Sequence, residues 1–594
     1  MKNLELLQEE LIRAKYEAFI IPTSDFHGSE YISDYFKARQ YFSSFTGSAG
    51  TLLVLQKSAF LWTDGRYFIQ AANELQDTGI ELMKMGEPNV PTIAEFINSN
   101  SSYIRNIAFD GRMMSTNEIL KLEKEIIPSI HLKSDPLIID HTWALRPKLP
   151  FSNLYILSKF FSGKTFKNKL QEVRDKMKEL KANSFLLTAL EDQAWLYNLR
   201  GNDVIHTPVF LSYTYITNES VILFVDQNKI DIEVSKYLDS ESVTIKPYFE
   251  VYDFVKSLKG KNILLDPNKV NYTLYQSLVE QNNLILDTNP TLYLKSIKND
   301  TEIKNIKKAH IKDGLCVTRF MKYLKESYVE EKELTEISLS DYIAKLRSKT
   351  KGYIDLSFNT ICAFNEHAAM MHYSATEQSN AKIDKSGFLL IDSGGHYLEG
   401  TTDITRTYAL GSISKEMKKH YTLVLKAVIN LASAVFLKGC RGVNLDILAR
   451  GPIWKELIDY KCGTGHGVGY LLSVHEAPNG FRWKIVPERN DSAVLEPGMV
   501  TTDEPGIYLE NKYGIRIENE LLCVPAGSSS FGDFLKFETI TYAPIDLDAI
   551  DASLLNKDEK RWLNEYHKMV YDNLSPLMKK EDELKFLEKY TRQI

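Results

Sequence analysis

The chain has 594 residues, of which 44% are hydrophobic and 25% are charged, and its formal net charge at pH 7 is -6. This length is too great for one hydrophobic core, so we expect several domains. An acidic balance without a long run of lysine and arginine offers no attractive surface to nucleic acid or to an anionic membrane, so neither partner is expected.

The first 21 residues predict an amphipathic helix followed by a strand rather than a signal peptide, because three glutamates lie among the leucines. No apolar run approaches the roughly 20 residues that a membrane-spanning helix needs. The cysteines are odd in number, scattered and without a CxxC pair, which is typical of a protein of the reducing cytoplasm. They are Cys316, Cys362, Cys440, Cys462 and Cys523.

Two stretches of the N-terminal half share one order of features and predict a degenerate repeat. LQEELIRAKYEAFIIPTSDFHGSEY and LQEVRDKMKELKANSFLLTALEDQAWLY each read as a polar amphipathic helix, a short apolar strand and an acidic turn before an aromatic segment. We therefore expect two α/β domains of similar size. The proline-containing stretch RPKLPFSNL marks the boundary between them, which gives domains 1–152 and 153–298.

A long charged helix is expected from about Asp300, and the segment from there to about Pro525 contains every dense polar motif of the chain. We assign residues 299–528 to a third domain and residues 529–594 to a C-terminal extension. The extension contains apolar side chains at helical spacing, which predicts a small packing or dimerisation module. These side chains are Trp562, Leu563, Tyr566, Met569 and Val570.

The segment Gly387–Thr407 predicts a hairpin with two inward-facing carboxylates. Its apolar run Phe388–Ile391 ends at Asp392, and the chain returns extended through Asp403. The two aspartates are equally far from a centre between residues 397 and 398, so we expect them to lie side by side. Like charges in such a position repel each other unless a cation lies between them.

The segment GMVTTDEPGIYLENKYGIRIENELLCV predicts a second hairpin of the same kind. A strand ends at Glu504, a Pro-Gly stop follows, and the chain returns through Glu518. These two glutamates are symmetric about Asn511. Between the hairpins in sequence, His466 lies among four glycines, which predicts an irregular turn that allows close approach to a ligand.

Together these residues offer four carboxylates and one imidazole, a donor set that suits a pair of Mn²⁺, Zn²⁺ or Co²⁺ ions. Cysteine is absent from the set, which disfavours structural zinc. Two such ions about 3.5 to 4 Å apart are a known arrangement for hydrolysis. A solvated acidic strand face remains the alternative interpretation of either hairpin alone.

The ordered set IDSGGHYLEGTTDITRT, GTGHGVG, VHEAP, TTDEPGIY and GIRIENE resembles the catalytic domain of the X-prolyl aminopeptidases, in the pita-bread metallopeptidase family. SDFHGSEY, FTGSAGT and LWTDGRYF resemble the N-terminal domain of the long three-domain members, and LKFETITYAPIDL with RWLNEYH resembles their C-terminal extension. The implied fold is α/β (α+β): two creatinase-like α/β domains, a pita-bread catalytic domain and a short helical extension.

The resemblance implies a role for each donor. Asp392 would be a terminal ligand of one metal ion and Asp403 a bridge between two, while His466 and Glu504 would bind the other ion. Glu518 would be the second bridge. Two divalent ions, with Mn²⁺ expected and Zn²⁺ or Co²⁺ as alternatives, are the implied cofactors.

Other positions match residues that line the substrate site in the family. His372 and His475 would stabilise the oxyanion or move protons, and Arg516 matches an active-site arginine. Arg66 matches a substrate-contacting arginine, with a structural turn residue as the alternative. His367 has no counterpart and is interpreted as a surface residue. Cys462 is a departure, because relatives often have histidine four residues before the metal-binding histidine.

The implied function is hydrolysis of the N-terminal Xaa-Pro bond of peptides by a hydroxide bridging two metal ions, with Glu504 taking the proton of the attacking water. A prolidase specific for dipeptides and a non-catalytic peptide-binding member of the fold are the alternatives. The expected partners are peptides with proline at the second position and a second copy of the chain, in the cytoplasm.

Overall fold

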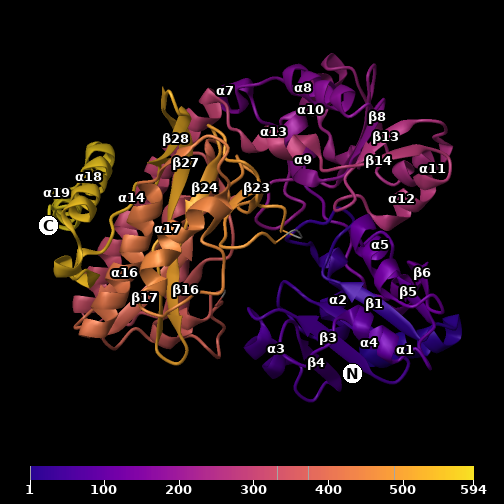
Figure 1. Cartoon of the computed structure of the whole chain (residues 1–594), viewed down its shortest axis with the longest axis horizontal. Helices are drawn as coiled ribbons and strands as arrows, with labels where there is room; N and C mark the ends of the chain where they lie inside the picture. The colour runs from indigo at the N-terminus through magenta and orange to yellow at the C-terminus, as the bar shows by residue number, and fades with distance from the viewer. Residues whose placement is uncertain (1, 331, 372, 487–488) are drawn as a thin grey trace. The chain divides into compact units, whose positions relative to one another are not determined.

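The structure is a computed structural model that describes residues 2–330, 332–371, 373–486 and 489–594 (Figure 1). The chain divides into two compact units. One unit contains Met1–Ile156 and Thr165–Thr291, and the other contains Leu157–Lys164 and Leu292–Ile594. Within the described ranges no helix combines the length and the apolar character that a membrane span requires.

The first unit contains two six-stranded mixed sheets built to one plan. The orders are β4-β3-β2-β1-β5-β6 and β12-β11-β10-β8-β13-β14, and equivalent pairs have the same direction. This confirms the predicted repeat. The strands of the first sheet are β1 Ala18–Pro22, β2 Thr51–Leu55, β3 Ala59–Thr63, β4 Ile80–Lys84, β5 Asn106–Phe109 and β6 His131–Ser134. Those of the second are β8 Ser184–Leu187, β10 Ser212–Thr217, β11 Val221–Val225, β12 Val243–Lys246, β13 Asn262–Leu265 and β14 Asn283–Leu286.

Equivalent amphipathic helices begin the two repeats. Helix α1 (Lys2–Ala14) buries leucines 4, 7 and 11, which recur at the helical period, and the strand β1 that follows is buried throughout. Helix α8 (Phe166–Glu179) buries Leu170, Val173 and Met177 in the same way before strand β8. The other longer helices of this unit are α5 Thr116–Glu125, α9 Leu190–Tyr197, α10 Ile232–Ser240, α11 Glu250–Ser257 and α12 Tyr272–Val279.

The second unit has the pita-bread arrangement, in which two sheets are each covered by a pair of long helices. One sheet has the order β16-β17-β20 and the other the order β21-β28-β27-β24-β22-β23, with the small sheets β15-β18-β19 and β25-β26 beside them. The strands are β15 Tyr353–Leu356, β16 Ile361–Phe364, β17 Gly387–Ser393, β18 Gly395–Tyr397, β19 Gly400–Thr401, β20 Ile404–Leu410, β21 Val435–Leu437, β22 Gly465–Gly467, β23 Glu476–Phe481, β24 Val500–Asp503, β25 Gly506–Leu509, β26 Tyr513–Arg516, β27 Asn519–Ser529 and β28 Gly532–Thr539.

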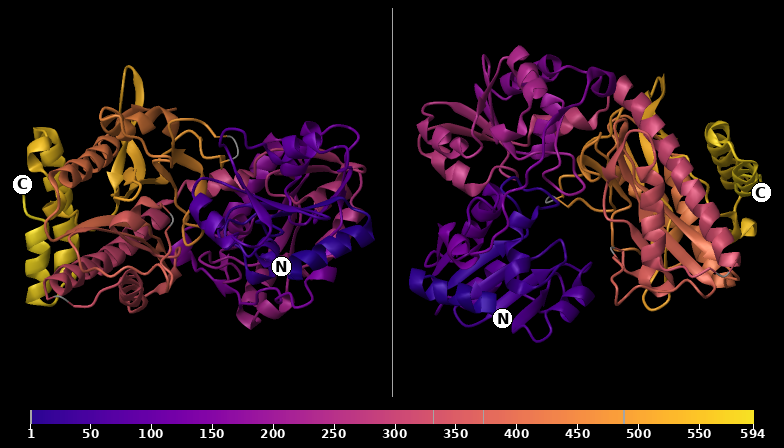
Figure 2. Two further views of the ribbon diagram at one scale, coloured as in Figure 1. Left: turned by 90° about the horizontal axis from the view of Figure 1, so that it is seen from below. Right: turned by 180° about the vertical axis from the view of Figure 1, so that it is seen from behind.

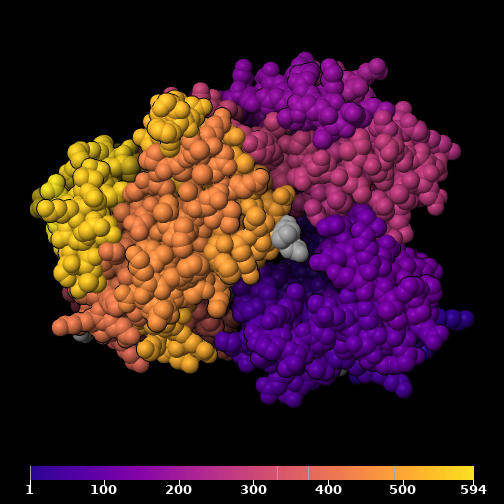
Figure 3. Space-filling model, in the orientation of Figure 1, coloured from indigo at the N-terminus to yellow at the C-terminus, as the bar shows by residue number. Residues whose placement is uncertain are grey.

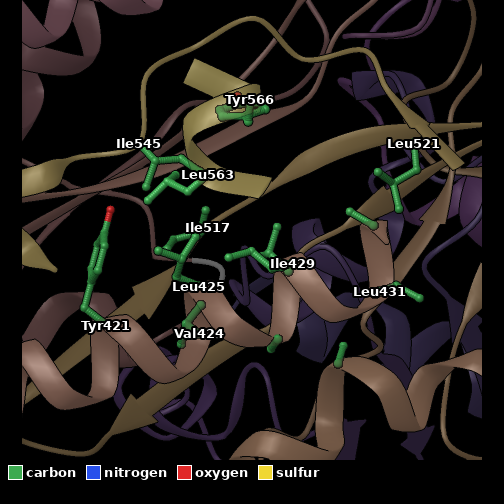
Figure 4. Packing of buried hydrophobic residues seen from close by; sticks show 14 of the residues in the cluster. Tyr421, Val424, Leu425, Ile429, Leu431, Ile517, Leu521, Ile545, Leu563 and Tyr566 are labelled. Carbon is green, nitrogen blue, oxygen red and sulfur yellow. The ribbon is translucent and has the colours of Figure 1, made fainter. Parts of the chain in front are cut away.

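Each of the two sheets that carry a helix pair packs on its helices through an apolar core. Helices α14 (Asp300–Val329) and α15 (Glu336–Ser348) pack on the first sheet, where Phe320, Leu324 and Leu339 contact the apolar side of β17 and β20. Helices α16 (Lys415–Ala432) and α17 (Gly442–Trp454) pack on the second sheet. Figure 4 shows Leu425 and Ile429 of α16 beside Ile517, and Leu521 belongs to the same cluster, so this core supports the second hairpin.

The C-terminal extension packs on this second core. Helix α18 (Lys557–Leu574) buries Leu563, Tyr566 and Val570 at the predicted helical spacing, and helix α19 (Glu581–Tyr590) follows. Trp562 stacks on Tyr566 with ring centroids 5.3 Å apart. The views agree that both helices lie against the other elements of the second unit (Figures 2 and 3). The apolar stripe of the extension is therefore used for packing within the chain.

Candidate metal centre

The first hairpin consists of β17 and β20, extended by the short pair β18 and β19. Asp392 pairs with Thr405 in the β17–β20 ladder, and the hairpin closes through a two-residue turn after Tyr397, which pairs with Gly400. The prediction that Asp392 lies directly opposite Asp403 is wrong by two residues. Asp403 instead lies in the break between β19 and β20. A displacement of two residues keeps a side chain on the same face of a strand, so both carboxylates still point to one side.

The second hairpin has the predicted register. Gly506 pairs with Arg516 in the β25–β26 ladder and Thr502 pairs with Glu520 in the β24–β27 ladder, which centres the hairpin on Asn511 as expected. Glu504 and Glu518 lie opposite each other in the gap between these two ladders.

Backbone hydrogen bonds hold the two glutamates in that gap. The N–H of Glu504 donates to the carbonyl of Thr464 over 2.8 Å, and the N–H of Glu518 donates to the carbonyl of Thr405 over 3.1 Å. The second bond connects the second hairpin to β20 of the first. The two hairpins, which are about a hundred residues apart in sequence, therefore form one frame around the acids.

His466 lies in the short strand β22, between β23 and β24, and not in the irregular turn that the glycines predicted. The glycines are nevertheless required for close packing. A Cβ on Gly465 would lie 1.9 Å from the carbonyl oxygen of Thr502, and a Cβ on Gly467 would lie 2.2 Å from that of Glu476. These glycines let β22 lie flush against its neighbours and carry the imidazole to the acids.

Four of the five predicted donors meet in one cluster. One ligand atom from each of Asp403, His466 and Glu518 lies within 4.8 Å of the others. Nε2 of His466 is 3.6 Å from Oδ2 of Asp403 and 3.4 Å from Oε1 of Glu504. Thr502 and Thr405 donate hydrogen bonds to Glu504 (3.2 Å) and Glu518 (2.7 Å), which orients their carboxylates.

The fifth donor, Asp392, is paired with Arg516. Nη2 of Arg516 lies 2.5 Å from Oδ2 of Asp392, while its Nη1 donates to the hydroxyl of Tyr508 and its Nε to the hydroxyl of Thr405. Arg516 is 3% exposed, so a full positive charge is held next to the acidic cluster with little solvent to screen it.

The electrostatics of the cluster call for a cation. Burial raises the pKa of Asp403 and of Glu518 well above their ordinary values, and the negative charges of neighbouring carboxylates raise both further. Burial also raises the pKa of Glu504, against the opposing effect of Arg516. In the described part of the chain, Oδ1 of Asp392 and of Asp403 is buried without a hydrogen-bond partner. Buried oxygens of this kind, beside an imidazole and without thiolate, fit divalent cations.

Two histidines are predicted to line the substrate site. His475 is exposed, and its ring meets that of His466 edge to face with centroids 4.4 Å apart, which places it beside the cluster. His372 lies outside the described residues.

Arg66 belongs to the first unit. It is half-buried, donates from Nε and Nη2 to the two carboxylate oxygens of Asp64 (2.8 and 2.7 Å), and its guanidinium lies 5.3 Å from the ring centroid of Tyr67. His367, interpreted from sequence as a surface residue, is half-buried and its Nδ1 lies 2.9 Å from Oε1 of the buried Glu336. The glutamate explains why this histidine is held inward.

Cys462 does not replace the histidine that relatives often have at its position. Burial raises the pKa of its thiol to about 12, and the nearby Glu504 carboxylate acts in the same direction. The thiol is therefore neutral at physiological pH and cannot exchange protons there as an imidazole does.

Sequence reasoning missed the buried polar residues that hold the first hairpin in place. Asp313 of α14 accepts hydrogen bonds from Arg347, Tyr397 and Thr402, and Arg347 also donates to the carbonyl of Ser393. The available signal was the position of Asp313, in line with the apolar side chains that α14 buries. A charged residue at a buried helical position requires a partner.

Comparison with family models assigns the chain in four consecutive segments. Residues 3–141 and 145–302 each match the Creatinase/Prolidase N-terminal domain, residues 304–525 match Metallopeptidase family M24, and residues 533–594 match the C-terminal region of peptidase M24.

Relatives match over almost the whole chain. A probable Xaa-Pro aminopeptidase P of Tuber melanosporum is 37% identical over 98% of this chain and 96% of its own length. The crystal structure of an X-prolyl aminopeptidase from Caenorhabditis elegans, described as a cytosolic enzyme with a di-nuclear active site, superposes with a TM-score of 0.91 at 35% identity, covering 98% of this chain and 95% of that one.

An Xaa-Pro dipeptidase from Bacillus anthracis matches less of the chain. It covers 64% of this chain and 99% of its own, with 25% identity and a TM-score of 0.50. The match of all four segments and the full-length likeness lead to one assignment: the chain belongs to the Xaa-Pro aminopeptidase family, within metallopeptidase family M24.

Proposed function

We propose that this protein is a dinuclear metalloaminopeptidase that hydrolyses the first peptide bond of peptides with proline at the second position. The observation that carries the proposal is the cluster in which ligand atoms of Asp403, His466 and Glu518 lie within 4.8 Å of one another. The full-length relatives named as Xaa-Pro aminopeptidases support the choice of substrate.

Five residues would hold two divalent ions. Asp392 would be a terminal ligand of one ion, His466 and Glu504 would bind the other, and Asp403 and Glu518 would be shared by the pair. Mn²⁺ is the proposed native ion, with Zn²⁺ and Co²⁺ as alternatives, because oxygen and imidazole donors without thiolate suit all three. When bound, such a pair lowers the pKa of water and polarises the scissile carbonyl.

The chain's own groups divide the remaining work. Glu504, whose pKa burial raises, accepts the proton of the attacking water and passes it to the departing proline nitrogen. His475 donates to the developing oxyanion, and His372 is proposed for the same task. Arg516 holds Asp392 in place through the 2.5 Å contact and offsets part of the negative charge. Arg66 is proposed to contact the substrate.

Proline at the second position explains why a dedicated enzyme is needed. The Xaa-Pro bond is a tertiary amide without an N–H, so an active site that binds the N–H of its substrate cannot position it. The bond also populates both cis and trans isomers.

Chelation and a peptide-length series test the proposal. Protein stripped of metal is expected to lose activity on Xaa-Pro-Yaa peptides and to recover it with Mn²⁺. Full turnover in excess chelator would refute the metal-dependent mechanism. Activity confined to Xaa-Pro dipeptides would identify a prolidase instead, and binding of peptides without hydrolysis after metal addition would identify a non-catalytic member of the fold.

We further propose the domain limits 1–152, 153–298, 299–528 and 529–594, a homodimer, and a cytoplasmic location. The cytosolic relative and the free cysteines support the location. The dimer is supported by exposed apolar side chains that gather in the second unit, where the rings of Trp454 and Trp483 are 6.3 Å apart and Leu457 is 97% exposed. Size-exclusion chromatography with light scattering tests it, and a monomer would exclude it.

A further inference from the structure

Asp403 lies at the one place in the first hairpin where the strand ladder is interrupted. The β17–β20 ladder ends at the pair Ser393–Ile404, and the β18–β19 ladder begins at His396–Thr401. The backbone of Asp403 therefore has no strand partner to set the direction of its side chain. Its carboxylate is nevertheless directed into the cluster with His466.

The backbone N–H of Asp403 is held by a side chain. It donates to Oε1 of Glu520 over 2.8 Å, whereas the N–H groups of Glu504 and Glu518 donate to backbone carbonyls. Glu520 lies in β27, opposite Thr502, and its own N–H is fixed by the hydroxyl of Thr541. The orientation of Asp403 thus depends on where the Glu520 carboxylate points.

A histidine from a third element lies at the other end of that carboxylate. Nε2 of His310, on α14, lies 3.0 Å from Oε2 of Glu520, and both side chains are 0% exposed. Burying two polar side chains completely costs folding free energy unless the two side chains interact. Their contact joins α14 to β27, and the hydrogen bond to Asp403 extends it to the first hairpin.

We propose that Glu520 and His310 form a positioning pair that sets the orientation of Asp403 and thereby the affinity of the centre for its metal ions. The pair acts on the peptide N–H of Asp403 and contacts neither substrate nor metal. The proposal rests on the proposed function, because it takes Asp403 to be a metal ligand. Groups that orient ligands in this way typically change metal affinity by about 10- to 100-fold when they are lost.

Titration of the metal-free full-length protein with Mn²⁺, in competition with a chelator of known affinity, tests the pair without relying on catalysis. Glu520→Leu removes the acceptor and is expected to weaken Mn²⁺ binding by about 10- to 100-fold. Glu520→Gln keeps an oxygen that can accept from Asp403 and is expected to restore most of the affinity. His310→Phe, which leaves Glu520 without its contact, is expected to fall between them.

Glu336→Leu is the matched control. Glu336 is also a fully buried glutamate of the second unit paired with a histidine, His367, and its acceptors hold Phe364 and Ala381 rather than a proposed ligand. The Glu336→Leu variant is expected to lower the melting temperature as Glu520→Leu does. Its Mn²⁺ affinity is expected to stay within about threefold of wild type.

The outcomes separate the inference from the proposed function. Wild-type protein that binds no Mn²⁺ would contradict the proposed function itself. If wild-type protein binds two ions, two results would overturn the positioning role alone. One is a Glu520→Leu variant that binds Mn²⁺ as tightly as wild type, and the other is a Glu336→Leu variant whose Mn²⁺ affinity falls as much as that of Glu520→Leu. If Glu520→Leu does not yield folded protein, His310→Phe decides, and an unchanged affinity in that variant overturns the proposal.

Discussion

The two hairpins carry two acids each but hold them by different means. In the second hairpin Glu504 and Glu518 face each other across the gap between two ladders, and backbone carbonyls anchor both. In the first, Asp392 belongs to a continuous ladder while Asp403 lies in a break. The two-residue turn sets the register of the first hairpin. The two aspartates are not symmetric about that turn, so they do not pair with each other. Two pairs of acids with similar spacing in the sequence are therefore held in place by different backbone arrangements.

The largest effect is expected when the two acids of the first hairpin are removed one at a time. Asp403→Asn is expected to lower kcat/KM by about a thousandfold or more, because a bridging ligand affects both ions and their contribution amounts to several kcal/mol. Asp392→Asn is expected to lower it by about a hundredfold and chiefly to reduce occupancy of one ion. Activity assays with metal analysis measure both. Equal losses of activity and of metal in the two variants would reject the bridging assignment of Asp403.

Arg406 connects the hairpins and offers the next largest effect. It is completely buried, and it donates to the carbonyls of Glu518 and Ala543 and to the hydroxyl of Tyr566. Arg406→Met removes all of these hydrogen bonds from a fully buried position, although the carbonyl of Ala543 still accepts from the hydroxyl of Tyr566. The substitution is expected to lower the free energy of unfolding by about 3 kcal/mol or more.

Urea denaturation of the full chain measures this loss, with Arg561→Met as the control. Arg561 forms an exposed pair with Asp558 on α18, so its loss is expected to change stability by less than about 0.5 kcal/mol. Similar midpoints for the two variants would show that the hairpins do not depend on Arg406.

Two glycines test the difference in how the two hairpins hold their acids. A Cβ on Gly394 would lie 1.8 Å from the carbonyl oxygen of Thr402, beside Asp403, whereas a Cβ on Gly514 would lie 1.8 Å from that of Ala368. Each substitution by alanine is expected to cost about 1–3 kcal/mol of stability. Only Gly394→Ala is expected to weaken Mn²⁺ binding, by about tenfold, because it displaces the break that contains Asp403.

Gly451→Ala is the control for both, since no atom of the described residues lies within 4 Å of its Cβ position and alanine favours the helix. Thermal melting and Mn²⁺ titration are the measurements. Tighter or unchanged Mn²⁺ binding by Gly394→Ala, beside a loss in Gly514→Ala, would reverse the comparison.

The smallest expected effect is a pH dependence that acts on the first hairpin. Its strand β20 is covered by residues 543–546, and the N–H of Ile545 donates to Nε2 of the buried His567 over 3.1 Å. Burial lowers the pKa of His567 to about 3, from an ordinary value near 6.5. Between these two pKa values, His567 is therefore protonated in the unfolded chain and neutral in the folded chain. The resulting stability is complete above about pH 6.5 and is lost as the pH falls toward 3, by at most about 1.4 kcal/mol per pH unit.

Thermal melting at pH 7.5 and pH 5 measures this loss. His567→Gln, which keeps an acceptor for Ile545 but does not titrate, is expected to reduce the difference in melting temperature between the two pH values. His131→Gln, at an exposed position of the first unit, is expected to leave that difference unchanged. A difference that His567→Gln leaves unaltered would assign the acid sensitivity to other groups.

The features that depend on neighbouring residues could be predicted from the sequence. Helix α14 begins at Asp300 as expected, the repeat of the first unit has the predicted order, and the second hairpin is centred on Asn511. Hydrophobic period and turn chemistry are local, so they can be read along the chain. The ordered motifs also led to the family that the full-length relatives establish.

The supports of the acids, in contrast, depend on how distant elements of the fold pack together. The position of Asp403 in a break, its N–H bond to Glu520, and the contact of Glu520 with His310 join residues 117 and 210 positions apart. The same holds for Asp313, 34 residues from Arg347 and 89 from Thr402. No local pattern encodes which buried polar groups will meet, because each reaches its partner only when distant elements have packed.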